Sequence, residues 1–155
     1  MKKIIFGMIL GLLVMVFTAC GGGGSSSSLP KMDNSKVGGI EITDGYYAGE
    51  NVLFAGTKIV GNWSFYQLEE SKSVNATFRN DGDARIENKD YSYGVSKDGR
   101  KISATSYIVP TTIEYKGIKK DFLKSEDASG KITFYDCYDI EWIDNYGIYN
   151  LIMCP

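Results

Sequence analysis

The sequence predicts an all-β domain of antiparallel strands, arranged either as a closed barrel or as a β-sandwich. Aromatic residues, which favour strands, make up 13% of the chain, with 11 tyrosines, seven phenylalanines and two tryptophans. Turn-forming residues recur about every 8–12 positions, as in barrels and sandwiches. After an N-terminal apolar segment, no stretch has the period of a helix. Three hairpins can be placed from these patterns.

The first hairpin is predicted within residues 74–86. Its loop has three residues and ends at Gly82, which suits the left-handed position of such a loop. This turn sets Phe78 opposite Ala84. The same register gathers apolar side chains on one face and polar side chains on the other, so the turn and the alternation agree.

The second hairpin is predicted within residues 91–104, around the dipeptide Asp98-Gly99. Asp-Gly favours a two-residue type I′ turn. The resulting register sets Val95 opposite Ile102, again with one apolar and one polar face. A slip by one residue would mix the two faces.

The third hairpin joins residues 132–143 to residues 148–154. If Ile143 pairs with Ile148, Cys137 lies directly opposite Cys154. One face of this hairpin is almost entirely apolar and is expected in the core. That face carries Ile132, Phe134, Asp136, Tyr138, Ile140, Trp142, Tyr149, Leu151 and Met153. The two cysteines fall on the opposite face.

Cys137 and Cys154 are therefore predicted to form a disulfide. Opposed residues of an antiparallel pair have Cα atoms about 4.5–5.5 Å apart, within the range of a disulfide. The bridge would close a loop of 16 intervening residues and stabilise the fold by about 3 kcal/mol. The alternative is two independent thiols.

Further strands are predicted on both sides of these hairpins. Residues 58–67 form one strand, and residues 37–54 contribute one or two more. Residues 107–123 form either a single strand or a hairpin that turns at Lys116-Gly117.

The N-terminus carries a targeting pattern. Met1-Lys2-Lys3 is positively charged and precedes 14 apolar residues at 4–17. A signal peptide has an apolar core of about 7–15 residues, whereas a membrane-spanning helix needs about 20, so residues 1–19 predict a signal peptide helix. Small residues, Thr18 and Ala19, then precede Cys20. This pattern resembles the lipobox of bacterial lipoproteins.

The resemblance implies that the chain is cut before Cys20 and that Cys20 carries a diacylglyceryl group, usually with a further acyl chain. Such chains anchor a protein to a membrane that it does not span. Residues 20–30 would be the lipid anchor and a flexible Gly/Ser linker, and residues 31–155 the β-domain. Because Gly21 follows the cysteine, the outer membrane is favoured where the host has one. The alternative is a secretory signal cut near Ala19, which leaves a free thiol.

Composition narrows the functional classes. Removal of residues 1–19 leaves 136 residues (155 minus 19), enough for one domain. The net charge changes from −2 to −4 when Lys2 and Lys3 are lost, and no basic patch predicts nucleic-acid binding. The chain has no histidine, the commonest general base and a common metal ligand. We therefore expect no enzyme, no metal site and no cofactor.

A second resemblance concerns the β-domain. Gly61-Asn62-Trp63, on the strand predicted over residues 58–67, matches the Gly-x-Trp signature of lipocalin and lipocalin-like barrels. Phe78 to Gly82 is similar to a hairpin of small bacterial lipocalin-like lipoproteins, and Lys97 to Ile102 contains a turn of the same style. This likeness covers roughly residues 58–155. It implies an up-and-down barrel in which Trp63 packs across one closed end.

Two functions follow as expectations. A lipocalin-like barrel would bind a small apolar ligand, with Asp136 as a polar anchor inside the cavity. The alternative for Asp136 is a position at a β-bulge near Cys137 or at the barrel mouth. The alternative function is a structural or interaction module of the cell envelope. An exposed aromatic patch around Tyr46 and Tyr47 would favour this alternative.

Overall fold

The computed structural model describes Leu29 and residues 31–155. The predicted signal peptide at 1–19, the lipid-attachment residue Cys20 and the Gly/Ser run of the linker lie outside the described residues. Across the described part of the chain, there is no helix with the length and hydropathy that a membrane crossing requires.

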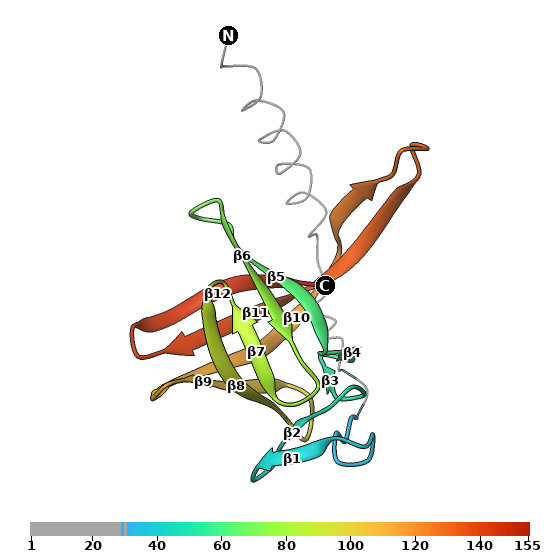
Figure 1. Ribbon diagram of the computed structural model, residues 1–155. Helices are drawn as coiled ribbons and strands as arrows, with labels where there is room; N and C mark the ends of the chain where they lie inside the picture. The colour runs from blue at the N-terminus through green and yellow to red at the C-terminus, as the bar shows by residue number, and fades with distance from the viewer. Residues whose placement is uncertain (1–28, 30) are drawn as a thin grey trace.

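Twelve strands form along the described residues (Figure 1). They are β1 Ile40–Thr43, β2 Tyr46–Ala48, β3 Leu53–Phe54, β4 Thr57–Lys58, β5 Gly61–Gln67, β6 Lys72–Phe78, β7 Asp83–Ile86, β8 Lys89–Ser96, β9 Lys101–Ser106, β10 Val109–Glu126, β11 Ile132–Asp144 and β12 Gly147–Cys154. The described domain is therefore all-β, as predicted.

The strands from β5 to β12 form a closed barrel. Each strand pairs antiparallel with the next one in the chain, and β12 returns to pair with β5. This order is that of an eight-stranded up-and-down barrel, so the sandwich alternative is excluded. The hairpin β1–β2 pairs with the end of β8, and β3–β4 forms a separate small sheet.

The three predicted hairpin registers are confirmed. Phe78 lies opposite Ala84, Val95 lies opposite Ile102, and Ile143 lies opposite Ile148. In each hairpin the turn residues and the alternation of apolar side chains specify the same register, which explains why the sequence sufficed.

The Asp98-Gly99 turn differs in type from the prediction. A type I′ turn needs positive φ at both residues, but only Gly99 has one, at 69°. The Gly99 amide instead donates to the carbonyl of Ser96 at 2.8 Å, and the Ser96 hydroxyl accepts from the Lys101 amide at 2.9 Å. These contacts favour a longer loop over 97–100 and leave the register unchanged.

Strand β10 is a single long strand, so the alternative of a hairpin at Lys116-Gly117 is wrong. That dipeptide lies at a β-bulge instead. Beyond the barrel, β10 and β11 continue as a two-stranded ribbon that projects from the molecule (Figure 1, orange). The predicted core positions of Ile132 and Phe134 are also wrong, since their side chains are 43% and 54% exposed. They lie on the ribbon, where no third strand or opposite wall covers them.

The segment before β5 covers one end of the barrel. Val52, Phe54 and Ile59 are fully buried and belong to the same core as the barrel interior. Asn34 holds this cover in place, because its buried side-chain amide donates to the carbonyls of Leu53 and Ser96, both at 2.9 Å. Figure 1 shows β1 and β2 below the barrel and β3 and β4 at its lower right.

Trp63 lies in the core beside this cover. Its indole is only 3% exposed and packs against the ring of Tyr138, with ring centroids 6.2 Å apart. The indole nitrogen donates to the carbonyl of Ile59 at 2.7 Å, so the ring ties the first barrel strand to the covering segment.

The predicted disulfide between Cys137 and Cys154 is present, with Cα atoms 4.5 Å apart. It lies on the outer face of the barrel, where it is buried together with Ile152 under Phe122 and Leu123 from the base of the ribbon. The disulfide lies next to the contact that closes the barrel, because Cys154 itself pairs with β5. Only three residue pairs join β12 to β5.

Candidate functional site

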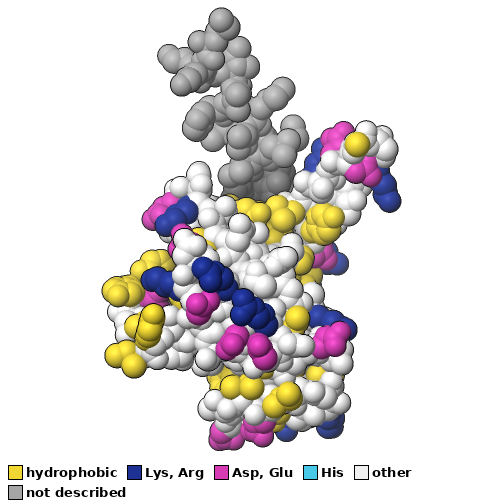
Figure 2. Space-filling view, in the orientation of Figure 1, with side chains coloured by type: hydrophobic (Ala, Val, Ile, Leu, Met, Phe, Trp, Pro, Cys, Tyr) yellow, Lys and Arg dark blue, Asp and Glu magenta, His cyan; other side chains and the backbone are white. Residues whose placement is uncertain are grey.

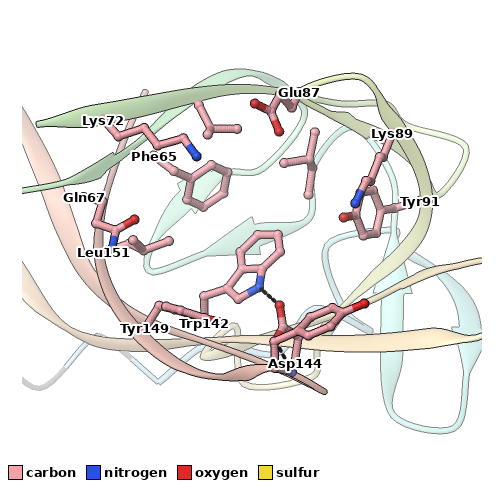
Figure 3. Close-up of a pocket in the computed structure, with 13 residues that line it drawn as sticks. Phe65, Gln67, Lys72, Glu87, Lys89, Tyr91, Trp142, Asp144, Tyr149 and Leu151 are labelled. Carbon is pink, nitrogen blue, oxygen red and sulfur yellow. Dashed lines mark hydrogen bonds between the residues drawn. The ribbon is translucent and has the colours of Figure 1, made fainter. Parts of the chain in front are cut away.

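The end of the barrel opposite the covering segment is open. A cavity of about 320 Å³ lies there, between the turns that join β5 to β6, β7 to β8 and β11 to β12 (Figure 3). Thirteen residues line it. They are Phe65, Gln67, Lys72, Val74, Ile86, Glu87, Lys89, Tyr91, Trp142, Asp144, Tyr146, Tyr149 and Leu151.

The walls of the cavity are apolar and aromatic. Strand alternation turns Phe65, Trp142 and Leu151 towards the interior, and the rings of Phe65 and Trp142 meet edge to face, with centroids 5.8 Å apart. Deeper in the barrel, Phe78 and Tyr93 pack with centroids 4.9 Å apart. Side chains thus fill the half near the cover and leave the half near the turns open.

Charged side chains surround the mouth. In Figure 3, Lys72 and Lys89 extend into the cavity from opposite sides, with Glu87 between them at the upper rim. All three are exposed at the open end. None of the ion pairs found among the described residues involves any of them. Their charges are therefore available to a ligand.

Asp144, the fourth charged residue, is already engaged. Its carboxylate accepts hydrogen bonds from the Trp142 indole nitrogen at 2.9 Å and from the amides of Tyr146 and Gly147 at 2.8 and 3.2 Å. The first of these bonds fixes the Trp142 ring across the cavity (Figure 3). Asp144 therefore orients a wall of the pocket and closes the β11–β12 turn.

Tyr91 contributes a phenolic hydroxyl at the side of the cavity. Burial raises the pKa of this hydroxyl above its ordinary value of 10.0, and the negative charges of Asp144 and Glu87 raise this pKa further. The hydroxyl therefore stays protonated at neutral pH and can act as a hydrogen-bond donor or acceptor.

Asp136 does not line the cavity. It is half-buried on β11, opposite a bulge of β10 that lies between Lys119 and Leu123. Its carboxylate accepts a hydrogen bond from the amide of Asp121 at 2.9 Å, an amide that the bulge removes from the strand ladder. The structure thus places Asp136 at the bulge near Cys137, the alternative considered above.

The mouth residues Lys72 and Lys89 were not identified from the sequence, although a signal for them exists. Lys72 pairs with Gln67, and Lys89 pairs with Ile86, in each case at the end of a hairpin. Both lysines continue the inward-facing alternation of their strands. A charged side chain at an inward position next to a turn indicates the mouth of a barrel.

Neither a metal site among the described residues nor a similarity to known proteins indicates a function, so the fold and this cavity are the basis for the proposals below. The described residues contain no group of acidic or cysteine side chains arranged to hold a metal ion. Protein-family models, curated proteins and solved structures give no match to this chain.

Proposed function

We propose that the barrel binds a small molecule with a largely apolar body in the cavity at its open end. The supporting observation is the apolar wall formed by Phe65, Leu151 and the fixed ring of Trp142. A volume of about 320 Å³ falls at the lower end of the usual range for ligand pockets, about 300–1,000 Å³. The likeness of Gly61-Asn62-Trp63 to the lipocalin signature supports the same function.

The proposal is for binding without catalysis. The sequence lacks histidine, and the carboxylate of Asp144 is held by three donors rather than directed at a ligand. The polar groups left free at the mouth are side chains that can orient a bound molecule.

We further propose that the protein is an extracytoplasmic lipoprotein anchored to a membrane through Cys20. The disulfide between Cys137 and Cys154 is typical of proteins outside the cytoplasm and supports this location. The test is metabolic labelling with a radioactive fatty acid. The wild-type chain should incorporate label and Cys20→Ser should not, whereas equal labelling of both would contradict the attachment site.

Native mass spectrometry tests ligand binding. Residues 29–155 are purified from an oxidising compartment, and the wild type is expected to carry a copurifying small molecule. Leu151→Trp fills the cavity and should lose that molecule. Ile148→Trp is the matched control, because Ile148 lies on the same strand but is exposed and does not line the cavity. If the wild type shows only the mass of the protein, the result would argue against the proposal that the cavity carries a small molecule.

A second candidate is the interaction module, which one observation favours. Tyr107 and Ile108, at the β9–β10 tip, are 100% and 89% exposed. Tyr107 also has a φ of 56°, which is unfavourable for a bulky residue. An exposed patch around Tyr46 and Tyr47 would also have favoured this candidate, but Tyr47 is buried and Tyr46 is half-buried. A photo-crosslinking amino acid at position 107 should capture a partner in cells if this candidate is right.

A further inference from the structure

The cavity mouth carries two cations and two anions, but these groups differ in how far their hydrogen-bonding capacity is already used. Among the described residues, Lys72 and Lys89 have no ion-pair partner, whereas the Asp144 carboxylate already accepts three hydrogen bonds. Both ammonium groups approach the cavity opening from different strands (Figure 3). Within the described part of the chain, the mouth thus offers two unpaired ammonium donors to an acidic group, against one carboxylate, that of Glu87, without hydrogen bonds of its own.

The cavity below the mouth suits a flat body. The rings of Trp142, Phe65 and Tyr91 form three of its sides, and the bond from Trp142 to Asp144 prevents the indole from turning away. Aromatic rings pack favourably on one another in offset or edge-to-face arrangements. A planar ring is therefore better matched to these walls than a flexible chain.

The cavity is also shallow. The contact between Phe65 and Trp142 narrows it from below. Beneath them, Phe78, Tyr93 and Met153 are almost fully buried, so a long chain has no channel to follow towards the cover. The space favours a compact ligand.

We propose that the pocket binds a compact aromatic anion, with its ring against Trp142 and Phe65 and its acidic group between Lys72 and Lys89. This inference rests on the proposed function, because it assigns a chemical class to the ligand of the same cavity. Glu87 opposes such a ligand by charge repulsion and so limits its affinity.

Two fluorescent probes with similar rings separate the two proposals. 1-Anilinonaphthalene-8-sulfonate carries a sulfonate, and N-phenyl-1-naphthylamine is its neutral counterpart. Both are titrated into the full chain carrying Cys20→Ser at several salt concentrations. We expect the sulfonate to bind at least about fivefold more tightly at low salt, with an advantage that shrinks as salt screens the lysines.

The charge variants give the sharpest test. Lys72→Gln and Lys89→Gln should each weaken sulfonate binding about fivefold, Glu87→Gln should strengthen it by a similar factor, and none should change binding of the neutral probe. The matched control is Lys124→Gln, an exposed lysine on the ribbon. It should leave both affinities unchanged.

The outcomes distinguish the two proposals. Suppose that both probes compete for one site and that Leu151→Trp abolishes the binding of both, but that the charge variants leave the sulfonate affinity unaltered. The anion proposal is then overturned, while the binding function stands. If neither probe binds, or if Leu151→Trp changes neither titration, both proposals are overturned.

Discussion

The indole nitrogen of Trp142 donates a hydrogen bond of 2.9 Å to the carboxylate of Asp144, two residues further along the same strand. Residues two apart on a strand share a face, so this bond lies within the barrel mouth. It joins the turn between β11 and β12 to the orientation of the aromatic wall.

Replacing Asp144 by Ala should therefore affect both stability and binding. The substitution leaves the indole and two turn amides without their acceptor, and we expect a loss of about 1–3 kcal/mol in the free energy of unfolding. Affinity for the naphthalene probes should fall as well. Asp127→Ala is the control, since Asp127 accepts similar bonds from Ser129 and Lys131 at the ribbon tip. Unchanged probe binding in Asp144→Ala would contradict the positioning role.

Removal of the disulfide should lower stability by about 3 kcal/mol, because the bridge closes a loop of 16 residues in the unfolded chain. The double variant Cys137→Ala, Cys154→Ala is compared with the wild type by urea unfolding. The wild type should also resist dithiothreitol, since both sulfur atoms are buried beneath Leu123 and its neighbours. Leu123→Ala should accelerate reduction, and equal rates would show that the ribbon base does not protect the bridge.

Two neighbouring tyrosines should respond oppositely to the loss of a hydroxyl group. The hydroxyl of Tyr115 is buried and has no hydrogen-bond partner among the described residues, whereas that of Tyr138 bonds to Thr57. Their rings pack together, with centroids 6.1 Å apart. We expect Tyr115→Phe to stabilise the protein by about 1 kcal/mol and Tyr138→Phe to destabilise it by a similar amount. Destabilisation by both would indicate an ordered water at Tyr115.

Alkaline pH should weaken the fold through Tyr93. Burial raises the pKa of Tyr93 far above its ordinary value of 10.0, and the charge of Asp81 raises this pKa further. Since the folded state holds this proton more tightly than the unfolded state, the contribution is complete below pH 10 and is lost as the pH rises above it.

The test compares the wild type with Tyr93→Phe by urea unfolding between pH 8 and pH 11. At pH 8 the variant should be less stable by about 1–2 kcal/mol, because it lacks the bond from the Tyr93 hydroxyl to the carbonyl of Arg79. The difference should shrink above about pH 10. A difference that stays constant across this range would contradict the assignment to Tyr93.

The tip residue Tyr107 should cost stability. Its φ of 56° lies in the left-handed region, which asparagine adopts more readily than a bulky residue. Its side chain is fully exposed and gains nothing from packing. We expect Tyr107→Asn to raise the midpoint of thermal unfolding by a few degrees. Tyr146→Asn, at another exposed tip but without positive φ, should not.

The sequence predicted the hairpins and the disulfide because two signals agreed. Turn residues such as Gly82 fixed the loops, and alternation then fixed which side chains face the core. Once Ile143 was set opposite Ile148, the distance between Cys137 and Cys154 followed from the geometry of paired strands.

Turn residues and alternation did not predict the ribbon or the pocket. Phe134 alternates like a core residue, but alternation does not tell how far the neighbouring strands extend, and β12 ends before it can cover that side chain. The same alternation placed Asp136 on the face expected in the core, whereas its side chain is only half-buried. Lys72 and Lys89 come together only when the sheet closes, since they belong to different hairpins.

The barrel seam sets the order in which the molecule can assemble. Ser64 pairs with Cys154, a separation of 90 residues (154 minus 64), and this contact belongs to the three pairs that join β12 to β5. Until β12 has been synthesised, the earlier strands form an open sheet with free edges on β5 and β11, which are prone to pair with other chains. Such distant contacts also slow folding. The Cys137–Cys154 bond ties β12 to β11 and so holds the last strand beside the β5 edge that it must reach.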